Sequence, residues 1–197
     1  IEKFKLDISG VWDDFKDKMQ EDLEMSAYAK KIVDGDYKYY DDFINRFRIL
    51  EFLNDFECSY RITASKKELQ LNIKFTTDEV VPKSVKQTRS NGMELVDKEL
   101  STSEFNSIMQ DFVCSVTLRA SNELFANIVI LENICVKLFD SKLNTATGKI
   151  ADELILEVNI DKKRLSSIDI SKVDPSDALS LFTPTMKFTK SAGFKAL

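Results

Sequence analysis

Histidine is absent from the 197 residues of this chain. An imidazole is the commonest general base near neutral pH, the usual activator of serine and cysteine nucleophiles, and a frequent ligand of catalytic zinc. Without it, Ser-His and Cys-His dyads and most catalytic zinc sites are excluded. We therefore expect no catalytic residue, no metal site and no cofactor, and we predict that the chain is not an enzyme in its own right.

Cysteine is scarce as well, and its three copies, Cys58, Cys114 and Cys135, are widely spaced. An odd number without a C-x-x-C pair fits neither a disulfide framework nor a zinc cluster. Free cysteine is usually buried in the core, and free thiols persist in a reducing compartment. The start of the chain lacks a signal-peptide pattern, and no apolar run approaches the ~20 residues that span a bilayer. The chain is predicted to be cytoplasmic, with no membrane contact.

Positive charge is also in short supply, with 28 lysine and arginine residues against 33 aspartate and glutamate residues. The net charge of -5 argues against a dedicated, sequence-independent binder of polyanions, but it leaves room for a local basic patch. Hydrophobic residues make up 43% of the chain, which is enough apolar surface for a packed core. We expect an α+β domain over 36–197, preceded by an N-terminal helix or linker over 1–35.

Apolar residues recur at helical spacing near the start of the chain, and charged residues fill the other faces. This pattern predicts a helix over 11–33, with Ser9 as its N-cap and Gly35 as its C-terminal cap. The apolar face consists of Trp12, Phe15, Met19, Leu23 and Ala27. A second helix is predicted over 37–55, which would complete a helical hairpin.

After residue 58 the pattern changes to the alternation that is typical of half-buried strands. Ser101 and Glu104 predict the start of a long helix, although 112–118 would also suit a strand. Asp174 and Pro175 predict the start of a short one. Strands are predicted over 59–64, 69–75, 84–88, 128–139, 153–160 and 185–189. The predicted fold class is α+β: an N-terminal helical hairpin, then a small, mainly antiparallel sheet packed against one long helix and a short C-terminal helix.

One motif resembles part of a phosphate-binding loop. Thr147-Gly148-Lys149 matches the end of that loop, but Leu143 stands where the first glycine belongs. Ile150 replaces the serine or threonine that would bind magnesium. We therefore interpret this segment as a solvent-exposed hairpin loop.

Acidic residues near 153–160 invite comparison with a metal-dependent nuclease. In a regular strand, Glu153 and Glu157 would share a face and Asp152 would point away from it. The lysine that a restriction-nuclease core places two residues after its acid is missing, because Asn159 follows Glu157 at that spacing. We interpret these acids as ordinary residues on the exposed face of a sheet.

Basic residues are the best candidates for contacts with a partner. Some flank the predicted strand 84–88, where lysines commonly protect an exposed edge, and others lie in a C-terminal segment that has no acid after Asp177. Arg119 lies within the predicted long helix, where an ion pair with Glu123 is the simplest interpretation and an interface arginine is the alternative. The candidate interface or nucleic-acid contacts are Arg119, Lys83, Lys86, Arg89, Lys187 and Lys190.

The order of several short motifs resembles the region that precedes the catalytic domain in bacterial restriction-endonuclease-like proteins of the Mrr type. The motifs are Gly35-Asp36, Lys67–Leu71, Asp78–Pro82, Leu118-Arg119, Glu123–Phe125, Thr147-Gly148, Leu154–Val158, Ile168–Ile170 and Val173–Pro175. The catalytic acids and lysine of that family lie downstream of this region, so the resemblance implies no catalytic role. Residues 187–197 depart from the family's pattern, which leaves the attached partner open.

The resemblance implies a non-catalytic accessory module, a sensor or assembly domain of a bacterial restriction or phage-defence effector. Its partner would be an effector domain or subunit of the same system, and a homo-oligomer is expected. Two alternatives stay open: a structural assembly subunit, such as a ring or phage-particle protein, and a DNA-binding module. A closed ring would favour the first alternative, and salt-dependent affinity for DNA would favour the second.

Overall fold

The computed structural model describes the backbone of residues 2–88, 94–144 and 147–197, and the side chains of residues 13–77, 79–88, 94–143 and 147–197. Its α-helices are α1 (Glu2–Asp34), α2 (Tyr40–Arg46), α3 (Thr77–Val80), α4 (Thr102–Asn127), α5 (Lys162–Ser166) and α6 (Pro175–Ser180). The 3-10 helices η1 (Tyr37–Tyr39) and η2 (Glu51–Phe56) flank α2. The strands are β1 (Ser59–Ala64), β2 (Glu68–Phe75), β3 (Ser84–Thr88), β4 (Leu95–Glu99), β5 (Asn133–Asn144), β6 (Lys149–Asp161), β7 (Thr185–Thr189) and β8 (Gly193–Lys195). The predicted α+β class is confirmed.

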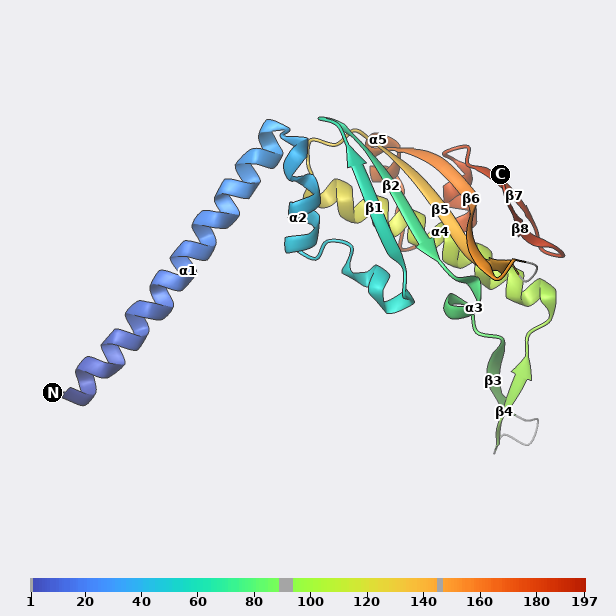
Figure 1. Ribbon diagram of the computed structural model, residues 1–197, viewed down its shortest axis with the longest axis horizontal. Helices are drawn as coiled ribbons and strands as arrows, with labels where there is room; N and C mark the ends of the chain where they lie inside the picture. The colour runs from blue at the N-terminus through green and yellow to red at the C-terminus, as the bar shows by residue number, and fades with distance from the viewer. Residues whose placement is uncertain (1, 89–93, 145–146) are drawn as a thin grey trace.

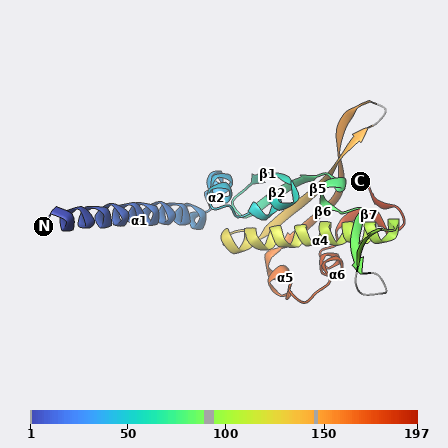
Figure 2. The ribbon, with the colours of Figure 1, turned by 90° about the horizontal axis from the view of Figure 1, so that it is seen from below.

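A six-stranded sheet, in the order β1-β2-β5-β6-β7-β8, forms the centre of the molecule, and β3 and β4 form a separate hairpin. All neighbours in the large sheet are antiparallel except β2 and β5, which run parallel. A parallel pair needs a crossover connection, and the chain supplies it with the β3–β4 hairpin and α4. α4 lies along one face of the sheet and leaves the opposite face open (Figures 1 and 2).

The hydrophobic core lies between the sheet and α4. Alternate residues of the central strands, such as Leu71 and Val136, are fully buried, as a strand with one covered face requires. α6 packs against another side of α4, so that helix is buried on more than one side. Even the hydroxyls of Thr117 and Ser121 are buried, and each donates to the carbonyl oxygen four residues earlier at 2.8 Å. These two hydrogen bonds provide partners for the buried hydroxyl groups of α4.

Two of the predicted helices differ from the observed ones. α1 runs through Ser9, which is therefore not an N-cap. The helix predicted over 37–55 is broken, because Arg48 adopts a left-handed backbone with φ of 53° after α2. The predicted long helix is confirmed as α4, including the 112–118 segment that would also have suited a strand.

The strands follow the prediction more closely, and β1, β2, β3 and β7 lie where it placed them. The strand predicted over 128–139 begins only at Asn133, because the Ile128 amide still hydrogen-bonds to the Leu124 carbonyl at the end of α4. β4, β8 and the short α5 were not anticipated from the sequence pattern. β3 pairs with β4 outside the main sheet, so it is not an edge strand of that sheet.

Among the described side chains, those of α1 that contact the rest of the molecule lie near its C-terminal end. Tyr28 packs against the rings of Phe43 and Phe47, and Arg46 forms an ion pair with Glu24. The remainder of the helix stands away from the sheet and α4 (Figures 1 and 2). Of the helices that the structure describes, none combines the length and apolar character that crossing a membrane requires.

Gly35 ends α1, as predicted. The Gly35 amide donates to the Ile32 carbonyl and the Asp36 amide donates to the Lys31 carbonyl, both at 3.0 Å. This is the Schellman arrangement, which requires a left-handed residue, and Gly35 supplies it with φ of 75°. The chain then turns into η1, so Gly35 sets the direction in which α1 leaves the body.

Candidate interaction surfaces

The basic residues that the sequence singled out lie on different parts of the molecule. Lys83 precedes β3 and Lys86 lies on it, within the hairpin that stands apart from the main sheet. Lys187 lies on β7 of the large sheet and Lys190 in the turn that follows it. Arg89 lies outside the described residues. The described lysines are therefore divided between two sheets and do not form one basic patch.

Arg119 lies on the exposed side of α4, and its environment differs from the simplest interpretation of the sequence. The expected ion pair with Glu123 is wrong: among the described side chains, no carboxylate lies within 4.0 Å of this guanidinium. Its carbon Cζ instead lies 4.1 Å from the centre of the Phe52 ring, which is a cation–π contact. Phe52 is buried and fixed in the core, so it holds the guanidinium in place without neutralising its charge.

An apolar groove of about 290 Å³ runs beside Arg119. Its floor and far wall are apolar, and its near wall carries polar side chains of α4. The lining residues are Ser115, Leu118, Arg119 and Asn122 from α4, Ile170 and Val173 from the segment before α6, and Pro175 at the start of α6. A groove of this size lies at the lower end of small-molecule sites, which span ~300–1,000 Å³. It can therefore take one or two side chains of a partner.

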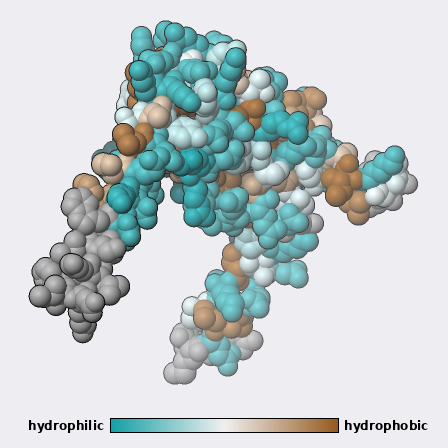
Figure 3. All heavy atoms as spheres, turned by 60° about the vertical axis from the view of Figure 1, so that its left-hand side comes forward, coloured by the Kyte–Doolittle hydropathy of each residue, from teal (hydrophilic) through white to brown (hydrophobic). Residues whose placement is uncertain are grey.

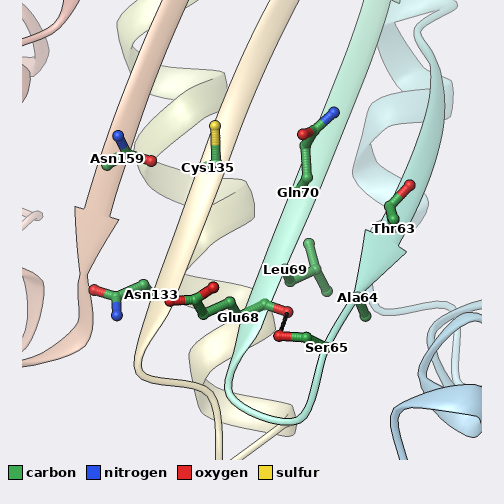
Figure 4. A pocket seen from close by; sticks show the side chains of 9 residues that line it. All are labelled: Thr63, Ala64, Ser65, Glu68, Leu69, Gln70, Asn133, Cys135 and Asn159. Carbon is green, nitrogen blue, oxygen red and sulfur yellow. Dashed lines mark hydrogen bonds between the residues drawn. The ribbon is translucent and has the colours of Figure 1, made fainter.

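The open face of the large sheet is a second candidate surface, and its lining is more polar than that of the groove beside Arg119. Figure 4 shows Gln70, Cys135 and Asn159 side by side on β2, β5 and β6, at the rim of a hollow of about 490 Å³. The side-chain amide of Gln70 donates to Asn72 Oδ1 at 3.1 Å, so the side chains of Gln70 and Asn72 partly satisfy each other. Farther along the same face, Arg61 borders another hollow of about 440 Å³. Most residues that line the two hollows are polar, although Leu69, Tyr60 and Phe139 add apolar surface to them.

All three cysteines are free thiols, as the sequence predicted, but their environments differ. Burial raises the pKa of Cys58 to about 11 and that of Cys114 to about 12, so both stay protonated near neutral pH. Cys135 is only half-buried and faces the open side of the sheet. Burial, and then the negative charge of Glu157, raise its pKa as well. Because the thiolate is the nucleophile, these shifts disfavour thiol chemistry at any of the three.

The acids of β6 are distributed differently from the regular-strand expectation. A bulge opposite Leu138 and Phe139 shifts the register, so Asp152 and Glu157 share the open face and Glu153 lies on the other. Each acid has a lysine partner: Lys74 pairs with Asp152, Lys142 with Glu153 at 2.9 Å, and Lys137 with Glu157 at 3.0 Å. Across the described residues, histidine, cysteine and acidic side chains do not gather into a group that could hold a metal ion.

Apolar side chains are exposed on elements that extend away from the body. On α1, Met19 is 50% exposed and Leu23 is 58% exposed. Leu95 on the β3–β4 hairpin is 68% exposed, and Ile150 near the tip of the β5–β6 hairpin is 74% exposed. Figure 3 shows brown, hydrophobic atoms on these arms, whereas the body is mostly teal. Large apolar side chains gathered on protruding arms are typical of surfaces that a partner covers.

The comparisons with known proteins identify no relative. No protein-family model matches the chain, and neither the curated proteins nor the solved structures contain a significant match. The interpretation of these surfaces therefore rests on their own geometry and on the sequence motifs.

Proposed function

We propose that this chain is a non-catalytic accessory module that assembles through α1, and that it serves a bacterial restriction or phage-defence effector. The observation that carries the assembly role is the stripe of exposed apolar residues on α1. Phe15, Met19 and Leu23 follow one another at intervals of one helical turn, and each is at least half exposed. A helix this far from its own core has to bury such a stripe against another chain to gain stability from it.

The size of that gain is considerable. Fully burying one large apolar side chain contributes about 1.5–3 kcal/mol. A stripe of such residues therefore provides enough free energy to offset part of the entropy lost when two chains associate. The predicted homo-oligomer is consistent with this energetic argument, because every copy of the chain carries the same stripe.

The link to an effector is supported by the motifs that resemble Mrr-type accessory regions. Several of these motifs coincide with positions that organise the fold. Gly35 ends α1, Lys67–Leu71 leads into β2, and Val173–Pro175 contains the N-cap of α6. Residues at such positions are the ones that a fold constrains, which makes their shared order informative.

A structural assembly subunit is the second candidate function, and the hairpin arms favour it. Leu95 and Ile150 are exposed on separate β-hairpins, so a copy could contact neighbours in more than one direction. Repeated contacts of this kind build rings or filaments. In the first candidate function the assembly serves an effector, and in the second the assembly is itself the structure. Both require α1 to bind another chain.

Analytical ultracentrifugation of the full chain tests the assembly role. We expect the wild-type chain to associate as its concentration rises, and the variant Met19→Gln/Leu23→Gln to remain monomeric. The matched control is Asp17→Asn/Glu21→Gln on the opposite side of α1, which leaves the stripe intact and should preserve association. Wild-type and stripe-variant chains that sediment identically at every concentration would refute the proposal.

A further inference from the structure

We propose that the groove beside Arg119 receives α1 from a second copy of this chain, with Met19 and Leu23 in the groove and Asp22 paired with Arg119. This inference rests on the proposed function, because it names the surface that α1 covers. It begins from the charge of α1. Residues 13–24 contain six acidic residues against two lysines.

That charge disfavours the simplest alternative, in which two copies of α1 pair with each other. Pairing two α1 helices along their apolar stripes would bring two acidic segments together, and like charges at a helix interface are destabilising. The better partner for α1 is an apolar surface with an unneutralised cation beside it. The groove on α4 has this combination.

The cation of the groove is Arg119, which has no carboxylate partner among the described side chains. Ser115 and Asn122 lie on the same side of α4, four residues before it and three after, and neither side chain makes a hydrogen bond within the described chain. The groove thus presents a row of available donors, one per helical turn. An arginine is also the side chain best suited to bind a carboxylate through two parallel hydrogen bonds.

The opposite wall and the floor of the groove accept apolar side chains. Leu118 is almost fully buried at the floor, whereas Val173 is 39% exposed along the wall. Covering Val173 and the neighbouring Ile170 would remove apolar surface from water on both partners. The groove volume of about 290 Å³ limits the occupants to a small number of side chains.

α1 carries a matching set of groups. Met19 and Leu23 are four residues apart and exposed on one face, and Asp22 is three residues after Met19, beside that face. Asp22 is itself exposed and has no ion pair among the described side chains. A helix laid along α4 would therefore bring one carboxylate to Arg119 while its apolar side chains enter the groove.

The occupant has to come from another copy. The base of α1 is held by α2 and by the turn at Gly35, and the helix points away from its own α4 (Figure 2). Met19 therefore cannot reach the groove of its own chain unless the contacts of α1 with α2 and the turn at Gly35 are broken. Reciprocal exchange of α1 would close a dimer, and one-way exchange would build a ring or an open chain.

Other cations of the body fit less well. Lys67 pairs with Glu132 at 2.5 Å, and the Lys162 ammonium donates to the Val129 carbonyl at 2.7 Å, so both already have acceptors. Arg61 also has no carboxylate partner among the described residues, but the polar and charged side chains of Asn72, Lys74 and Asp152 line the hollow beside it. The groove beside Arg119 fits Met19 and Leu23 better, because Leu118, Ile170 and Val173 line it. Arg61 is therefore a suitable control for a nonspecific effect of positive charge.

A charge exchange tests the inference in the full chain. The variants are Asp22→Arg, Arg119→Asp and the double variant that carries both changes, with Arg61→Asp as the control. We expect each of the first two variants to raise the dissociation constant of self-association by about 10-fold or more, as loss of a close charge pair does. The double variant should restore most of the affinity, since the pair is re-formed with its charges reversed. Arg61→Asp should leave the dissociation constant unchanged.

The outcomes separate this inference from the proposed function. If Met19→Gln/Leu23→Gln abolishes association while Arg119→Asp and the double variant leave it as in the wild type, α1 assembles elsewhere and the groove is not its site. If the stripe variant also associates normally, the assembly role of α1 fails along with the groove. Circular dichroism and thermal melting of each variant show that the fold is retained, and rescue by the double variant excludes a loss of affinity through misfolding.

Discussion

At the scale of single residues, the start of α4 shows how side chains fix an element that the whole fold depends on. The Glu104 amide donates to Ser101 Oγ at 3.3 Å, and the Glu104 carboxylate accepts from the Ser101 amide at 2.8 Å. Replacing Ser101 with alanine removes the cap, which typically costs about 1 kcal/mol. We expect Ser101→Ala to lower the free energy of unfolding by about that amount in urea titrations at neutral pH. Ser103→Ala is the control, because Ser103 lies two residues after Ser101 and its side chain makes no capping hydrogen bond.

The same cap predicts a dependence on pH. The hydrogen bonds from Ser101, and then the nearby Lys98 ammonium, lower the pKa of Glu104 from 4.5 to about 2. A carboxylate whose pKa is lowered by folding stabilises the native state above its unfolded pKa, and this contribution is lost as pH falls toward the folded value. The difference in melting temperature between wild type and Ser101→Ala should therefore shrink from pH 5 to pH 2. A difference that stays constant over this range would mean that the Glu104 charge plays no part in the cap.

Single residues also show how much of the candidate site the sequence can reveal. Arg119 stood out because it is a cation among core positions of a helix, and the groove does lie beside it. Its contact with Phe52 joins segments far apart in the chain, and the wall formed by Val173 depends on how α6 packs against α4. Neither is encoded in local spacing. The sequence could therefore identify the residue, but not the cavity next to it.

At the scale of elements, the sequence predicted those helices and strands whose formation depends on neighbouring residues. β1, β2, α4 and α6 were predicted well because alternation, a capping box and an Asp-Pro start are written in neighbouring residues. The break after α2 and the bulge in β6 were missed because Arg48 and Ile155 carry no distinctive turn chemistry. The bulge also reversed the predicted faces of Glu153 relative to Glu157. One irregular residue changes every side-chain direction beyond it.

Gly35 gives the sharpest prediction at this scale, because it joins α1 to the body. A Cβ at this position would lie 2.7 Å from Lys66 Cε and 3.1 Å from Ile130 Cδ1, with a left-handed backbone of φ +75°. Gly148 has a similar φ of +66° but nothing within 4 Å of such a Cβ. The left-handed conformation alone costs about 1–2 kcal/mol for a residue with a Cβ. We expect Gly35→Ala to destabilise the protein more than Gly148→Ala in urea titrations, since only Gly35 adds a steric clash. Equal losses would show that the Lys66 side chain moves aside without cost.

At the scale of the whole molecule, the position of α1 determines the shape of the monomer. Its 33 residues span about 50 Å at 1.5 Å per residue. A compact chain of this length would have a radius of gyration of about 16 Å. We expect small-angle X-ray scattering of the dilute Arg119→Asp variant to give a clearly larger radius and an elongated distance distribution. A radius near 16 Å would mean that α1 folds back onto its own body. In that case the chain's own α1 could reach the Arg119 groove, and exchange with a second copy would no longer be required.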